Sequence, residues 1–237
     1  MTASELLVFA RCAGFIFRAP GLSHPSVPHA VRAAMALLLA CAIGPRQSVV
    51  ARDGIVLIAL LVMEFVLGSL MGLAASLLYD GAYAAGRMLD DYVGVKAIAP
   101  NLAIVAPSGF GRVWSIAFTG GYFLFGAYRL TLYGLAQSFE RIPLGVPVAA
   151  RAWTTFAFSY ASTIVQVALE VAAPAIALAF VTQVTLAALA RTIPRFASFT
   201  LSFPLVFGVV LIATAISIPL ASARAIHPLM LFPGDAR

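Results

Sequence analysis

The chain has little charge for its length. Only 10% of its 237 residues are Asp, Glu, Lys or Arg, whereas about a quarter of the residues in a typical soluble domain are charged. Residues 196–223 contain none of these four residue types, and this stretch exceeds the roughly 20 apolar residues that a helix needs to cross a bilayer core. Because 62% of the residues are hydrophobic, the sequence predicts an integral membrane protein with a single domain, residues 1–237.

The positive charge is sparse and scattered, although the net charge is +6. Basic residues mostly lie at the ends of apolar segments: Arg32, Arg46, Arg52, Arg112, Arg151, Arg191, Arg195 and Arg224. This pattern is typical of membrane-interface anchors and topology signals. It does not form the basic patch of a nucleic-acid-binding protein, so no nucleic-acid partner is expected.

Residue types that carry catalysis or bind metals are also scarce. The two cysteines, Cys12 and Cys41, both fall in apolar runs, which favours small buried hydrophobic residues over a disulfide or a metal site. The sequence has no GxSxG motif, no P-loop and no dinucleotide fingerprint. We therefore expect no enzymatic activity and no cofactor.

Proline, glycine and charged residues divide the apolar sequence into segments. Apolar helices are expected over about 4–19, 29–43, 54–79, 112–138, 152–172 with a continuation to 190, and 199–220. A separate amphipathic helix is expected over about 80–96, because Asp80, Arg87 and Asp91 share one helical face. Internal prolines indicate kinks or breaks. The predicted fold class is an all-α, membrane-type bundle of kinked and split helices.

Four ionisable residues lie within apolar stretches: Arg11, Glu64, Arg129 and Glu170. Each costs on the order of 2.5–3.5 kcal/mol at the centre of a membrane helix, so each must face a partner, a cavity or water. One interpretation is a proton or ion relay. The other is structural pairing of an arginine with a glutamate, or contact with another subunit.

Glycines in the third segment and an apolar loop are two further candidates for function. Gly68 and Gly72 form a GxxxG pattern, which indicates close helix packing either between subunits or within the chain. The loop over about 97–111 is unusually apolar and is expected to pack against something. Its apolar and proline residues are Ile98, Pro100, Leu102, Ile104, Val105, Pro107 and Phe110.

The order of several short motifs resembles that of a known family. These motifs are Phe9–Phe15 with Ala19-Pro20, Val27-Pro28 with Val31-Arg32-Ala33, Glu64 with Gly68 and Gly72, Ala85-Gly86 with Leu89-Asp90 and Gly94, Leu135–Gly145, and Leu189-Ala190-Arg191 with Pro194 and Phe203-Pro204-Leu205. Over about residues 5–220 the chain resembles the export-gate subunits of type III secretion systems, the family of flagellar FliR and injectisome SctT.

The resemblance implies a non-enzymatic helical subunit of a pore assembly in the bacterial inner membrane, multi-pass and within the secretion basal body. One copy would join several SctR/FliP-type and SctS/FliQ-type membrane subunits. An SctU/FlhB-type switch protein would wrap the cytoplasmic mouth, and unfolded secretion substrates would pass through the pore. Helices shielded by neighbouring subunits would also explain the short, charge-interrupted segments.

Within this family, two groups of residues gain expected roles. The 97–111 loop would be a plug that closes the pore, since a hydrophobic constriction resists wetting by ions; alternatively, it packs on its own bundle. Subunit-interface or pore-lining roles are expected for Glu64, Gly68, Gly72, Arg87, Asp90 and Asp91. The alternative function is a small secondary transporter, because transporters also use broken helices with buried Glu and Arg residues.

Overall fold

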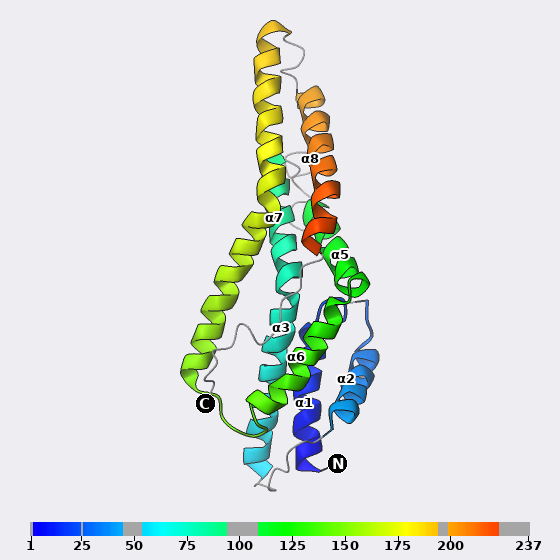
Figure 1. The fold of residues 1–237 in the computed structure, drawn as a ribbon, viewed down its shortest axis with the longest axis vertical. Helices are drawn as coiled ribbons and strands as arrows, with labels where there is room; N and C mark the ends of the chain where they lie inside the picture. The colour runs from blue at the N-terminus through cyan, green and yellow to red at the C-terminus, as the bar shows by residue number, and fades with distance from the viewer. Residues whose placement is uncertain (1, 25, 45–53, 94–108, 194–198, 223–237) are drawn as a thin grey trace. The chain divides into compact units, whose positions relative to one another are not determined.

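The computed structural model describes residues 2–24, 26–44, 54–93, 109–193 and 199–222. Every regular element in these ranges is an α-helix (Figure 1), which confirms the predicted all-α class. The helices are α1 (Ala3–Arg18), α2 (His29–Ile43), α3 (Gly54–Val93), α5 (Gly109–Leu124), α6 (Ala127–Arg141), α7 (Ala150–Thr192) and α8 (Phe199–Ser222).

The described helices form two compact units, and each unit combines segments that are far apart in the sequence. The first contains residues 2–77 and 126–162 of the described chain, so it holds α1, α2, α6 and one end of each of α3 and α7. The second contains residues 78–125 and 163–222, with α5, α8 and the other ends of α3 and α7. Two long helices therefore run from one unit into the other.

The first two helices begin and end where local chemistry dictates. Thr2 caps α1 in a capping box: its hydroxyl accepts from the Glu5 amide at 3.3 Å, and the Glu5 carboxylate accepts from the Thr2 amide at 2.8 Å. Gly44 ends α2 with φ +64°, a conformation that glycine adopts without strain. The predicted bounds of both helices are correct to within about a residue. Figure 1 shows α1 and α2 side by side.

Glycines allow α1 and α3 to cross with their backbones in contact. A Cβ atom on Gly68 would overlap the carbonyl oxygen of Arg11, and one on Gly14 would overlap the carbonyl oxygen of Phe65. A Cβ on Gly72 would lie 2.6 Å from the Phe15 carbonyl oxygen. The GxxxG pattern therefore packs within the chain, which is one of the two arrangements expected for it. The subunit-interface or pore-lining role of Gly68 and Gly72 stays a prediction.

Helix α3 continues without interruption from Gly54 to Val93, so the predicted boundary at Asp80 is wrong. The glycines after that point do not break the helix because their missing side chains make room for neighbours. A Cβ on Gly81 would lie 2.6 Å from a methyl group of Val167 in α7, and one on Gly86 would overlap the backbone of Gly111 in α5.

The predicted single helix over 112–138 is also wrong, because it is split into α5 and α6. Gly126 lies between them with φ +74°, in the left-handed region that favours glycine. In contrast, α7 continues through Pro174 as one helix. In the second unit α5 and α8 lie side by side, and the rings of Phe110 and Phe207 meet with centroids 5.1 Å apart.

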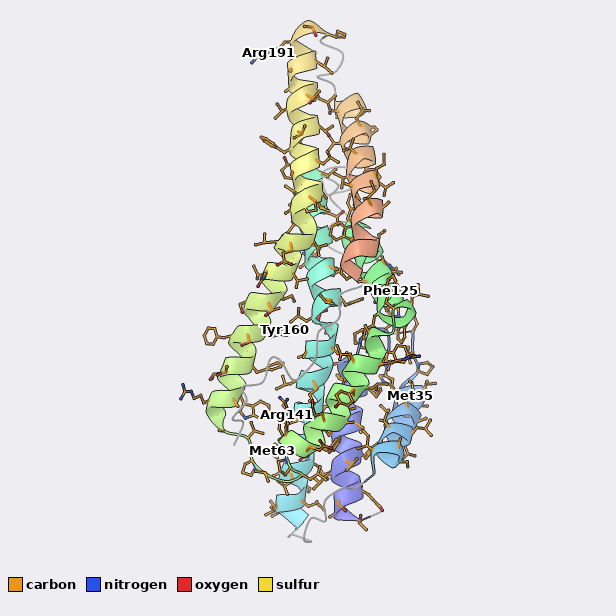
Figure 2. The ribbon with its side chains drawn as sticks, viewed as in Figure 1. Met35, Met63, Phe125, Arg141, Tyr160 and Arg191 are labelled. Carbon is orange, nitrogen blue, oxygen red and sulfur yellow. The ribbon has the colours of Figure 1, made fainter. Side chains whose placement is uncertain are left out.

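Two helices, α3 and α7, are long and apolar enough to cross a membrane. Only 28% of the most apolar part of α3 and 33% of that of α7 is buried within the chain. Figure 2 shows side chains projecting outward along these helices, with Tyr160 and Arg191 labelled on α7. Core helices of a soluble protein would be covered by their own chain, so these exposed apolar surfaces are those of a membrane-type bundle.

We predict opposite effects for the same substitution at two helical glycines. Gly68→Ala should lower the stability of the chain in detergent by about 1–3 kcal/mol or more, since the new methyl group overlaps the α1 backbone. Gly120→Ala should raise it by about 0.5–1 kcal/mol, because nothing lies within 4 Å of its added Cβ and alanine stabilises a helix relative to glycine. Thermal unfolding measures both, and equal shifts would contradict the observed helix crossing.

Candidate functional site

The centre of the first unit is a buried ion pair between α1 and α3. The Nε atom of Arg11 donates to Oε2 of Glu64 at 2.6 Å. Both residues are fully buried, at 0% exposure. Burying either charge alone would be very unfavourable, so each residue is retained in the core only because the other is there.

Arg11 also binds the end of α6. Its Nη1 atom donates to the carbonyl oxygens of Ser138 at 3.1 Å and Ile142 at 3.0 Å, and to the Ser138 hydroxyl at 3.3 Å. The guanidinium carbon lies 4.5 Å from the centroid of the Phe139 ring. Carbonyl groups at a helix C-terminus carry partial negative charge, so a cation is stabilised there.

The second carboxylate oxygen of Glu64 holds the turn that follows α6. Oε1 accepts from the backbone amide of Gly145 at 3.0 Å. Gly145 has φ +71°, so only glycine fits this turn without strain. Through these bonds, one Arg–Glu pair connects α1, α3, the end of α6 and the turn toward α7.

The geometry of this cluster fits a structural clamp better than a proton relay. Arginine stays protonated in proteins, so Arg11 cannot exchange a proton with Glu64. Among the described atoms, only Nη2 of the Arg11 guanidinium has no hydrogen-bond partner in this cluster. The remaining bonds fix both side chains in place.

A second buried cluster lies in the second unit, around Asp90. Its Oδ1 atom accepts from the Phe110 amide at 3.1 Å, and the residue is 1% exposed. A carboxylate at this point satisfies an unbonded amide of the first turn of α5 and complements its helix dipole. Within the described chain, Oδ2 of Asp90 and Nε1 of Trp114 are buried without a hydrogen-bond partner.

Comparison with known proteins identifies the family. The model for "Bacterial export proteins, family 1" matches residues 2–229. The chain belongs to this family. A similar protein is the flagellar biosynthetic protein FliR of Aquifex aeolicus (strain VF5), which is 24% identical over 219 residues, covering 91% of this chain and 85% of the relative.

Three of the motifs that carry the resemblance meet at the Arg11–Glu64 cluster of the export protein. They are the run around Arg11, the run from Glu64 to Gly72, and the run Leu135–Gly145. Sequence reasoning singled out Arg11 and Glu64 and allowed for their pairing, but missed the four residues that complete the site: Ser138, Phe139, Ile142 and Gly145. The signal was available, because Leu135–Gly145 stood out as a motif without an assigned role.

Two of the four predicted buried charges are not buried within the chain. Arg129 and Glu170 are exposed on α6 and α7. The Arg129 guanidinium contacts the phenol of its neighbour Tyr128, and Gln166 donates to Glu170 at 2.9 Å. The apolar sequence around each residue indicated burial, but these stretches face outward, so their low polarity does not mean that the chain covers them.

The other candidate residues are placed as follows. Arg87 and Asp91 are exposed near the end of α3, whereas Asp90 between them faces inward. Glu64 is wholly enclosed by its own chain, and its subunit-interface or pore-lining role stays a prediction. Of the predicted plug, Phe110 is described, and it lies in the first turn of α5 with 3% exposure rather than in a loop. The remaining plug residues, Ile98, Pro100, Leu102, Ile104, Val105 and Pro107, lie outside the described residues.

The two cysteines differ in environment. Cys12, next to Arg11, is buried as expected, whereas Cys41 on α2 is exposed. Burial raises the pKa of the Cys12 thiol to about 12, and the adjacent Arg11 cation offsets only part of this rise. Cys12 is therefore a neutral thiol at physiological pH and packs as a small apolar side chain.

The Arg11–Glu64 pair makes a double-variant prediction. Arg11→Met should destabilise the export protein by about 3–5 kcal/mol, since it leaves the Glu64 carboxylate buried without its cation. The double variant Arg11→Met with Glu64→Leu should be more stable than Arg11→Met alone. Unfolding in detergent measures the two single variants, Arg11→Met and Glu64→Leu, and the double variant. Arg129→Met is the exposed-arginine control that leaves the midpoint unchanged. A double variant as unstable as the sum of the single variants would contradict a paired role.

Proposed function

We propose that this export protein is a non-enzymatic component of a type III or flagellar protein-export apparatus. The family match over residues 2–229 carries this proposal. The similarity to a flagellar biosynthetic protein over most of both chains supports it. The closed Arg11–Glu64 cluster is consistent with a scaffold, because its charged groups bond to each other and to backbone atoms instead of lining an open site.

In this proposal, one copy joins SctR/FliP-type and SctS/FliQ-type membrane subunits to form the export pore. The observation in favour is the amount of apolar surface that the chain leaves uncovered. On the chain alone, Leu38 is 69% exposed, Leu124 is 85% exposed and Phe158 is 79% exposed. Such side chains need lipid or protein neighbours. An assembly of helical subunits in the bacterial inner membrane supplies both.

The segment that follows α3 is proposed as the plug of this pore. Support comes from the described residues on both sides of it. Asp90 near the end of α3 binds the first turn of α5, and Gly86 contacts Gly111, so the chain leaves and returns at one place in the second unit. The apolar composition of residues 97–108 suits a constriction that resists wetting by ions.

The composition of the purified complex tests the proposed function. The chain, tagged after Arg237, should come out of membranes in mild detergent as a single copy in a large complex with two kinds of small helical membrane protein. Native mass spectrometry gives the composition. A monodisperse monomer or homodimer would contradict the proposal and favour a transporter, and transport by the purified chain alone would then be the next assay.

Ion conductance tests the plug. Replacing residues 100–107 with a Gly-Ser link should make the assembled pore leak ions. Asp90→Leu should leak or fail in export as well, because it releases the first turn of α5. The control is Met88→Leu, a change at an exposed position of the same helix, which should behave as the wild type. Unchanged conductance in the Gly-Ser variant would rule out the plug.

A further inference from the structure

The second unit contains a buried acceptor and a buried donor that have no hydrogen-bond partner among the described residues. The acceptor is Oδ2 of Asp90 on α3, and the donor is Nε1 of Trp114 on α5. Both residues are enclosed by the chain, so bulk water does not reach either atom. Leaving such groups unpaired is costly, and nearly all buried polar groups in folded proteins bond to protein or to ordered water.

Both side chains belong to one contact between α3 and α5. Oδ1 of Asp90 accepts from the Phe110 amide at 3.1 Å. Gly86, one turn before Asp90, lies against the backbone of Gly111. Trp114 follows Phe110 by one turn and is therefore on the same face of α5. A long side chain in a helix leans toward the N-terminal end of that helix, so we expect the indole to lean toward the turn that Asp90 binds.

The neighbouring hydroxyl groups of α5 bond to their own helix, which the indole of Trp114 does not do. The Ser115 hydroxyl donates to the Arg112 carbonyl oxygen at 2.9 Å. The Thr119 hydroxyl donates to the Ser115 carbonyl oxygen at 2.8 Å. A short hydroxyl side chain reaches the preceding turn in this way. An indole nitrogen can only donate, so the partner of Trp114 is an acceptor outside these local bonds.

We infer that the contact between α3 and α5 is a binding site for one ordered water molecule, held by Asp90 and Trp114. Water serves both atoms, because it donates to Oδ2 and accepts from the indole N–H. A proton on Oδ2 would not complete the site, since Asp90 and Trp114 would then both be donors. A metal cation is excluded by the indole, which donates and cannot act as a ligand.

The water gives Asp90 a second connection to α5. Oδ1 holds the first turn of α5 directly, and Oδ2 holds Trp114, one turn later, through the water. Glu64 in the first unit also uses both carboxylate oxygens, one for Arg11 and one for the amide of Gly145. In each unit a buried carboxylate of α3 therefore connects two neighbouring groups. This inference does not depend on the proposed function, because it concerns a contact within one chain.

Nuclear magnetic resonance of the indole protons tests the site in the full chain in detergent. Isotope labelling of tryptophan gives two indole signals, because Trp114 and Trp153 are the only tryptophans. Trp153→Phe identifies the Trp114 signal by removing the other. The expected result is a hydrogen-bonded Trp114 indole proton with cross-relaxation to a long-lived water. Asp90→Leu should abolish this cross-relaxation, whereas Met88→Leu, the control at an exposed position of α3, should retain it.

A milder variant covers the case in which Asp90→Leu also releases α5. Asp90→Asn keeps an oxygen for the Phe110 amide and replaces the other acceptor with a donor. The water should remain, accepting from both side chains, and the Trp114 indole signal should shift. A hydrogen-bonded indole without cross-relaxation to water would overturn the inference, because its partner would then be a protein group. An indole signal typical of a free N–H would overturn it as well, and so would cross-relaxation that Asp90→Leu leaves unchanged.

Discussion

The Arg11–Glu64 pair is the interaction on which the first unit depends. A buried charge is tolerated when it is paired and hydrogen-bonded, and apart from Nη2 of Arg11 the charged groups of this pair bond across four chain segments. Arg11 donates to the carbonyl groups at the end of α6, and Glu64 accepts from a backbone amide in the turn toward α7. The pair gives these segments one arrangement, because sliding any of them would leave a charged or polar group buried without a partner.

The pair in turn depends on the close approach of two helices. Gly68 lies one turn after Glu64, and its missing side chain lets the backbone of α3 contact the carbonyl oxygen of Arg11. With the backbones that close, the guanidinium can bond to Glu64 and still reach the end of α6. The glycines and the charged residues therefore act together. The glycines let the two helices approach closely, and the ion pair fixes their register.

The sequence predicted the existence of the helices more accurately than the environment of their side chains. The bounds of α1 and α2 followed from local breakers such as the glycine at position 44, and in the structure Thr2 caps α1 close to the predicted start. The continuity of α3 was not predicted, because the charged face of Asp80, Arg87 and Asp91 indicated a separate helix. The contacts of Gly81 with Val167 and of Gly86 with Gly111, which hold the continuous helix against its neighbours, are visible only in the structure. Likewise, the sequence around Arg11 and the sequence around Arg129 are both apolar and so predict the same environment. In the structure Arg11 is buried and Arg129 is exposed. A hydrophobic segment indicates that its side chains are shielded from water. It does not indicate whether the chain itself, lipid or another subunit shields them.

Two glutamates in apolar helices have different environments within the chain. Glu64 receives a cation, a backbone amide and complete burial from the same chain. Glu170 receives an amide from Gln166 one turn away but remains on the surface, among half-exposed Val165 and Leu169. An apolar helix of this chain therefore carries a charge in two ways, because Glu64 is enclosed by the chain whereas Glu170 lies at its surface. The sequence around the two residues is similarly apolar, so only the packing of the helices distinguishes them.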